Sequence, residues 1–132
     1  MDGIAPLDQI QIWIRETAAA WALPDTCAHD LRQVAYELAA NALEHTRSRT
    51  EGLAITLVLD CTGALTVEVR DNGREDGAAP AIVTDADARW MDCGRGLLLV
   101  DGLSTWRVTE AVPHCPRLGH VVAAKLHEPA AA

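Results

Sequence analysis

Three polar residues recur at every fourth position in one otherwise apolar stretch of the sequence. Within ELAANALEHT, the residues Glu37, Asn41 and His45 are surrounded by alanine and leucine, which favour a helix. Residues four apart lie on one face of a helix, so the spacing predicts a row of polar groups. On a helical projection this row borders an apolar stripe made of Leu31, Val34, Ala35, Leu38 and Ala42.

A carboxylate and an amide at such a border could face a cavity between the helix and a sheet. The Asn41 side-chain oxygen is a hard neutral ligand that suits Mg²⁺, an ion that usually keeps several waters and also binds phosphates. Glu37, one turn earlier, could accept a proton from a nucleophile. On this helix alone the alternative is a set of interfacial polar residues, with His45 near a helix C-terminus, where a cation is favourable.

Two further segments carry glycines where a ligand could approach the backbone. VRDNG ends an expected strand, so Asp71 is a carboxylate at a strand end, close to Gly73. Asp71 could accept a hydrogen bond from an exocyclic amine such as that of adenine, although Asn-Gly is also a common turn pair. GRGLLLV places Gly94 and Gly96 before an expected helix, whose free N–H groups could bind phosphate. It is neither a dinucleotide-binding fingerprint nor a Walker loop, because the third glycine and the G-K-[ST] ending are missing.

The elements that must position these residues begin with two helices. Asp8 could cap the first, and Pro24 separates it from a second helix that starts at Asp25 or Thr26 and runs to about His45 or Thr46. The first helix should bury one apolar stripe, made of Ile10, Trp13, Ile14, Thr17, Ala18 and Trp21.

Alternating apolar residues predict four strands after these helices. The first two, over residues 53–60 and 65–70, should form a hairpin, as should two more over residues 105–112 and 121–126. A third, short helix follows Gly96. This order predicts an α+β fold: a two-layer α/β sandwich with helices on one face of a mixed, mainly antiparallel sheet.

Length and composition indicate one domain over residues 1–132, with a long polar functional loop at about 74–93 and a disordered tail at 128–132. The net charge of −8 argues against nucleic acid as the main partner.

Four widely spaced cysteines predict free thiols in a reducing cytoplasm. The sequence opens with no signal peptide and has no long apolar run, so we expect a protein that is neither exported nor membrane-spanning. A polar loop is the preferred interpretation of His114, Cys115 and His120, because zinc ligands are usually spaced more tightly.

Taken in order, ELAANALEH, VRDNG and GRGLLLVDGLS resemble the N box, G1 box and G2 box of the GHKL (Bergerat-fold) ATPase superfamily. Within it, the chain is most similar to the bacterial anti-sigma-factor serine/threonine kinases, over roughly residues 7–126. The resemblance implies the Bergerat ATP-binding fold, with ATP and Mg²⁺ as cofactors and residues 74–93 as the ATP lid.

The resemblance also implies roles for individual residues. Asn41 would coordinate the Mg²⁺ that bridges the ATP phosphates, and Glu37 would act as general base on a serine hydroxyl of a protein substrate. Asp71 would recognise the adenine amino group, with Gly73 shaping the pocket. The backbone N–H groups directed to the phosphates would be those of Gly94, Arg95, Gly96 and Leu97.

The implied partners are a sigma factor, held inactive, and a STAS-type anti-sigma-factor antagonist, phosphorylated on serine. Family members also commonly form homodimers. The alternative is a non-catalytic ATPase-fold regulatory interaction module with weak or no nucleotide binding. Two departures favour it: Val121 stands where the family often has a threonine hydroxyl near the adenine, and the chain starts close to its first helix, where relatives often have a strand. The ATPase module of a histidine kinase is a third hypothesis, weakened by the lack of a helix pair carrying a phosphorylatable histidine.

Overall fold

The first two helices form a pair joined by a tight turn. In the computed structural model, which describes residues 6–45, 52–60, 63–73 and 95–127, α1 spans Pro6–Ala20 and α2 spans Asp25–His45. Proline suits a first helical turn, so α1 starts at Pro6, and Asp8 lies inside that turn instead of capping it. After α1, Ala22 adopts φ +52°, and the Leu23 N–H donates to the Ala18 carbonyl at 3.0 Å. This turn and Pro24 bring α2 back along α1.

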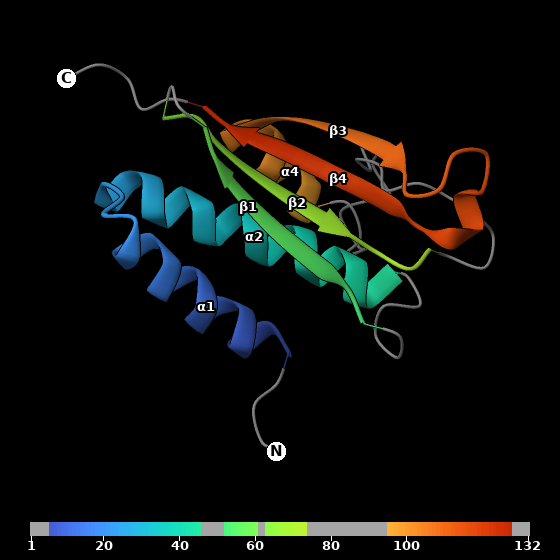
Figure 1. The fold of residues 1–132 in the computed structure, drawn as a ribbon, viewed down its shortest axis with the longest axis horizontal. Coiled ribbons are helices and arrows are strands. Elements are labelled where there is room, and N and C mark those ends of the chain that lie inside the picture. Colours follow the sequence, from blue (N-terminus) through green and yellow to red (C-terminus); the bar gives the residue numbers. More distant parts are fainter. Residues whose placement is uncertain (1–5, 46–51, 61–62, 74–94, 128–132) are drawn as a thin grey trace.

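The apolar stripe predicted for α1 is only partly buried. Ile14 and Ala18 are buried against the rest of the protein. Trp13 and Trp21, predicted to share that buried face, remain 40% and 37% exposed, so this part of the prediction is wrong. The reason is that α1 lies at the edge of the helical layer and packs mainly on α2, which covers a narrow part of its surface (Figure 1).

The four strands of the described part form one antiparallel sheet. The strands β1 (Ala54–Leu59) and β2 (Leu65–Arg70) make the first hairpin, and β3 (Ser104–Glu110) and β4 (His120–Leu126) make the second. Both hairpins confirm the sequence prediction. The order β1-β2-β4-β3 adds the antiparallel pairing of β2 with β4, which joins the hairpins. Every pairing among the described strands is antiparallel.

The third helix and a short 3-10 helix complete the described elements. The helix α4 (Arg95–Leu103) leads directly into β3, and Ser104 caps this junction by donating from Oγ to the Val100 carbonyl at 2.6 Å. The 3-10 helix η2 (Pro116–Leu118) lies in the connection between β3 and β4. The Gly119 that follows η2 leads the chain into β4.

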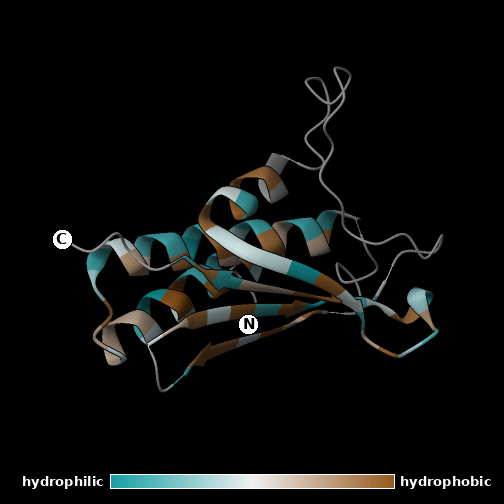
Figure 2. Ribbon diagram, turned by 90° about the horizontal axis from the view of Figure 1, so that it is seen from above, coloured by the Kyte–Doolittle hydropathy of each residue, from teal (hydrophilic) through white to brown (hydrophobic). Residues whose placement is uncertain are grey.

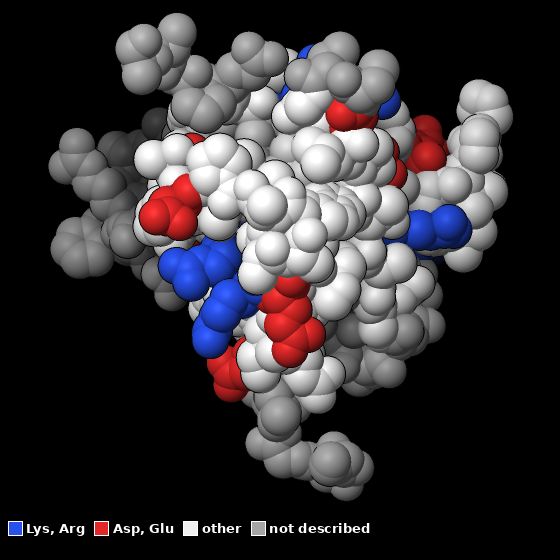
Figure 3. Space-filling model, turned by 60° about the vertical axis from the view of Figure 1, so that its left-hand side comes forward, with Lys and Arg blue, Asp and Glu red and all other residues white. Residues whose placement is uncertain are grey.

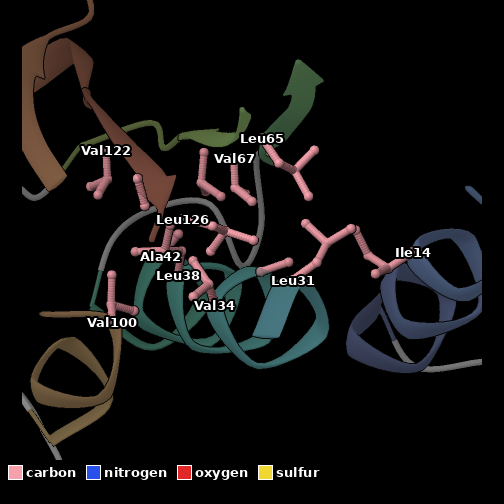
Figure 4. Packing of buried hydrophobic residues seen from close by; sticks show 13 residues of the cluster. Ile14, Leu31, Val34, Leu38, Ala42, Leu65, Val67, Val100, Val122 and Leu126 are labelled. Carbon is pink, nitrogen blue, oxygen red and sulfur yellow. The ribbon is translucent and has the colours of Figure 1, made fainter. Parts of the chain in front are cut away.

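The core lies between the helices and one face of the sheet (Figure 4). Inward-facing residues alternate along the two central strands, so Val67, Val69, Val122 and Ala124 are buried. Figure 2 shows both hydrophobic and hydrophilic residues on the helices, as expected for helices with one face in a core. The predicted two-layer α+β sandwich is confirmed. Side chains that α2 inserts into this core are Leu31, Val34, Ala35, Leu38 and Ala42.

Several sequence predictions concern residues outside those that the structure describes. These are the loop at 74–93, the tail at 128–132, Cys61 and Cys93. Within the described part, Cys27 and Cys115 are free thiols, and no helix is both long enough and apolar enough to cross a membrane.

Truncation of a core leucine tests the packing of α2. Leu31 is fully buried, so Leu31→Ala should lower the free energy of unfolding by about 2–5 kcal/mol, because it removes buried methyl groups and leaves a cavity. The exposed Ile12→Ala on α1 is the control and should change stability by less than about 0.5 kcal/mol. Urea denaturation measures both, and similar effects from the two substitutions would contradict the described packing.

Candidate functional site

Several predicted site residues come from elements that reach the same end of the sheet. The strand β2 ends at Arg70 and β4 begins at His120, and their antiparallel pairing sets Arg70 opposite Val121. The C-terminal end of α2 reaches this end of the sheet (Figure 1). The helix α4 runs away from it, because β3 starts at the opposite end, where Ser104 pairs with Leu126. The C-terminus of α4 therefore lies at the end of the sheet opposite Asp71.

Asp71 is a buried carboxylate held in a fixed orientation. Its side chain is only 2% exposed. Its Oδ1 atom accepts hydrogen bonds from the Gly73 N–H at 2.7 Å and the His120 N–H at 3.1 Å. Among the described residues, its other oxygen, Oδ2, has no hydrogen-bond partner. The carboxylate is thus anchored through one oxygen and can accept a hydrogen bond from a ligand through the other.

Two glycines let the segments around Asp71 cross in contact. Gly73 has φ +85° and Gly119 has φ +115°, conformations that favour glycine. A Cβ atom on Gly73 would collide with the Arg117 carbonyl oxygen and would lie 2.8 Å from the Gly119 nitrogen. A Cβ atom on Gly119 would collide with the Asp71 carbonyl oxygen. Gly73 therefore has a structural role in addition to the pocket-shaping role that the sequence resemblance implies.

Asn72 fastens the same segment to the beginning of the first hairpin. Its side-chain Nδ2 donates to the carbonyl of Gly52, two residues before β1. The Asp71 N–H donates to the His120 carbonyl at 3.0 Å. The loop that follows β2 is thus tied on one side to β1 and on the other to β4.

Glu37 and Asn41 lie half-buried on α2, as their place at the border of the apolar stripe predicts. In Figure 4, Val100 of α4 lies on the side of α2 that carries Val34, Leu38 and Ala42, whereas Ile14 of α1 lies beside Leu31. Asn41 projects about 20° from Val34 at 100° per residue, so it lies on the border nearer α4.

Burial alters the acid–base chemistry of Glu37. Burial, and to a smaller degree the charge of Glu44, raise the pKa of Glu37 above its ordinary value. A raised pKa makes a carboxylate a better proton acceptor once it is ionised, because the pKa moves toward the working pH. The glutamate that the sequence predicts as general base thus has an environment consistent with that role.

His120 was missed as a site residue by the sequence analysis, which assigned it to a polar loop. The structure instead places it at the start of β4, where it is 4% exposed, and its Nδ1 atom is buried without a hydrogen-bond partner. The same register corrects the expectation for Val121, which alternates to the other face of the sheet. Strand periodicity extended one residue earlier, to His120, Val122, Ala124 and Leu126, could have revealed this.

Part of the predicted phosphate-binding segment lies outside the residues that the structure describes. Gly94 is not among the described residues, nor are the side chains of Arg95, Leu97 and His45. The backbone of α4 begins at Arg95, so the N–H groups of Arg95, Gly96 and Leu97 belong to the first turn of the helix. N–H groups in a first turn lack partners within the helix and can bind an anion.

The described residues fit a metal ion that is held mostly by a bound nucleotide and only in part by the protein. No three His, Cys, Asp or Glu side chains in the described part cluster as a metal site. Asn41 could supply one neutral oxygen. Mg²⁺ commonly takes one or two protein ligands together with water and phosphate oxygens, so Asn41 fits a magnesium–nucleotide complex better than a free ion site.

Comparison with known protein families finds a match over most of the chain. Residues 4–114 match the family described as "Histidine kinase-like ATPase domain". No curated protein matches the chain significantly. The matched range includes Glu37, Asn41 and Asp71 but ends before Gly119 and His120.

Substitution of Gly119 tests the contact between the two crossing segments. Gly119→Ala should lower the free energy of unfolding by about 3 kcal/mol or more, because it combines an unfavourable φ with a backbone collision. Gly63 has a similar φ of +86° but open space around its missing Cβ, so Gly63→Ala should cost only about 1–2 kcal/mol. Chemical denaturation of the two variants separates strain from collision, and equal losses would argue against the crossing.

The pH dependence of stability tests the environment of Glu37. Because the folded protein holds this proton more tightly than the unfolded chain, ionisation of Glu37 opposes folding. This penalty is absent below the ordinary glutamate pKa and grows as the pH rises through the raised value. Glu37→Gln should therefore melt at a higher temperature than the wild type at pH 7, with the difference vanishing near about pH 4.

The exposed Glu16→Gln on α1 controls for the loss of one negative charge from an acidic protein. Melting curves across the pH range, followed by circular dichroism, measure the differences. A Glu37→Gln variant that is less stable than the wild type at neutral pH would contradict the described burial.

Proposed function

The chain belongs to the histidine kinase-like ATPase domain family, and from this premise we propose that it is an anti-sigma-factor protein serine/threonine kinase. As a member of this family it is an ATPase-fold protein that binds ATP. In the proposed role it holds a sigma factor inactive and transfers the ATP γ-phosphoryl group to a serine of a STAS-type antagonist. The observation that carries the proposal is the buried Asp71, anchored through Oδ1 with Oδ2 left for a ligand.

Asp71 is suited to an amine donor on an adenine. An ionised carboxylate only accepts hydrogen bonds, so its Oδ2 atom matches the adenine amino group. Backbone donors from Gly73 and His120 keep the carboxylate oriented before the nucleotide arrives. Such preorganisation reduces the entropy lost on binding.

The polar row on α2 provides two groups, Glu37 and Asn41, that assist the transfer of the phosphoryl group. Glu37 accepts the proton of the attacking serine hydroxyl, and its raised pKa favours this role. Asn41, one turn later and on the α4 side, holds Mg²⁺ together with the nucleotide phosphates. The ion supplies charge neutralisation on the phosphates. The N–H groups of Arg95, Gly96 and Leu97, with that of Gly94, bind the phosphate oxygens in this proposal.

The surface supports protein partners over nucleic acid. The net charge is −8, and the face in Figure 3 shows positive and negative side chains close together beside a broad uncharged area. Several large apolar side chains are exposed, among them Ile12 and Trp13 on α1. Exposed aromatic and aliphatic groups of this kind are common at protein interfaces.

These exposed side chains also favour the second candidate, a non-catalytic interaction module with the same fold. Val121 does not support this candidate, because it faces away from the Asp71 side chain and its lack of a hydroxyl does not bear on base recognition. A module of this kind would retain a sigma factor or other regulator in a pull-down without transferring labelled phosphate.

Nucleotide-dependent stabilisation and transfer distinguish the candidates. Millimolar ATP with Mg²⁺ should raise Tm by several degrees, since ligand at a hundredfold excess over Kd adds about 2.7 kcal/mol. Asn41→Ala should remove most of that shift. Glu37→Ala should keep the shift but lower transfer of labelled phosphate to the antagonist by at least about a hundredfold.

The exposed Glu16→Gln on α1 is a control that should behave as the wild type in both measurements. A wild-type Tm that is indifferent to ATP and Mg²⁺ would refute the kinase proposal. Stabilisation by ATP without phosphate transfer to a serine would favour the interaction module.

A further inference from the structure

The fold does not explain why a histidine, rather than an apolar residue, occupies the buried position 120. The Nδ1 atom of His120 is inaccessible to solvent and has no hydrogen-bond partner. Leaving a buried polar nitrogen unpaired is unfavourable, and native proteins pair nearly all such atoms. An apolar side chain would satisfy this position of β4 at least as well, so a ligand that pairs with Nδ1 would account for the histidine.

His120 and Asp71 stand side by side on neighbouring strands. The β2–β4 register places Arg70 opposite Val121, and its next step places Asp71 opposite His120. Asp71 follows the inward-facing Val69 by two residues, and His120 precedes the inward-facing Val122 by two, so both side chains lie on the helix-facing side. Directly opposed residues have Cβ atoms about 4.5–5.5 Å apart. One small ligand can therefore contact both.

The backbone links the two groups into one unit. The His120 N–H donates to Asp71 Oδ1 at 3.1 Å, and the Asp71 N–H donates to the His120 carbonyl at 3.0 Å. A change in the position of one residue therefore moves the other. Two polar atoms are left without a partner among the described residues: an acceptor, Asp71 Oδ2, and an imidazole nitrogen, His120 Nδ1.

We propose that His120 is a second base-recognition residue, which donates from Nδ1 to the N1 atom of an adenine whose amino group is held by Asp71. This inference rests on the proposed ATP binding and adds a specificity-determining residue to it. Adenine presents a donor, its amino group, directly beside an acceptor, N1. Asp71 Oδ2 and a protonated Nδ1 of the neutral imidazole form the complementary pair.

The same pair rejects guanine. Guanine carries an acceptor oxygen where adenine has the amino group and an N–H donor where adenine has the N1 acceptor. Asp71 would then face an oxygen, and His120 would face a donor. Sites built to hydrogen-bond a particular edge discriminate strongly, because the wrong ligand leaves buried polar groups unpaired.

The test compares ATP with 1-deaza-ATP, which keeps the amino group but replaces N1 by C–H. Isothermal titration of the full chain in the presence of Mg²⁺ should show ATP binding about fivefold to tenfold more tightly than 1-deaza-ATP. His120→Leu should weaken ATP binding and bring the ratio of the two dissociation constants to about one. His120→Asn, whose amide nitrogen lies near the position of Nδ1, should restore most of the ratio.

The ratio isolates the contact at N1, since a general loosening of the site weakens both nucleotides alike. Equal binding of the two nucleotides by the wild type overturns the inference while leaving ATP binding intact. So does a His120→Leu variant that keeps the wild-type ratio. A wild type that binds neither nucleotide overturns this inference together with the proposed function. The wild-type comparison needs no substitution, so the result does not depend on how well a variant folds.

Discussion

The hydrogen bonds of Asp71 Oδ1 hold together the end of the molecule on which the proposed chemistry depends. One oxygen accepts from the loop after β2, at Gly73, and from the start of β4, at His120. Asp71 and His120 are 49 residues apart in the sequence, so the carboxylate joins the two hairpins of the sheet at this end. Bonds to a charged acceptor are about twice as strong as neutral ones, and here the acceptor is buried. The crossing of Gly73 and Gly119 lies directly beside that junction.

The sheet order explains why residues so far apart in the sequence meet. The pairing of β2 with β4 places the end of one hairpin beside the start of the other. On the helical side, α2 packs across both central strands, and α4 lies beside the same part of α2. A half-buried row on α2 and a buried carboxylate on β2 thus come to the same side of the sheet without any long-range polar contact between them.

The periodicity of apolar residues predicted the helices and strands of this fold well, because it shows which face of each helix or strand is buried. The alternation in β2 and the stripe of α2 both survive in the structure, and the hairpins follow from short connections. Periodicity failed where the burial of a residue depends on which other elements pack against it, because a local pattern does not identify those elements. Trp13 and Trp21 fit the stripe of α1 but lie exposed, since α1 is at the edge of its layer. Pairing of β2 with β4 could not be read locally, so the position of His120 beside Asp71 was invisible in the sequence.

The glycines of the motifs show why a motif alone is weak evidence for chemistry. Gly73 lies against the backbone of Arg117 and Gly119 so closely that the fold itself requires glycine there. A protein that kept this fold and lost its nucleotide would still keep that residue. The informative groups are those whose placement the fold does not explain: the free Oδ2 of Asp71, the unpaired Nδ1 of His120, and a glutamate whose pKa is raised by burial. The unpaired Nδ1 of His120 and the half-buried carboxylate of Glu37 each carry a cost in the free protein, and a bound nucleotide would offset the cost at His120. Groups of this kind therefore argue for a ligand more directly than the glycines do.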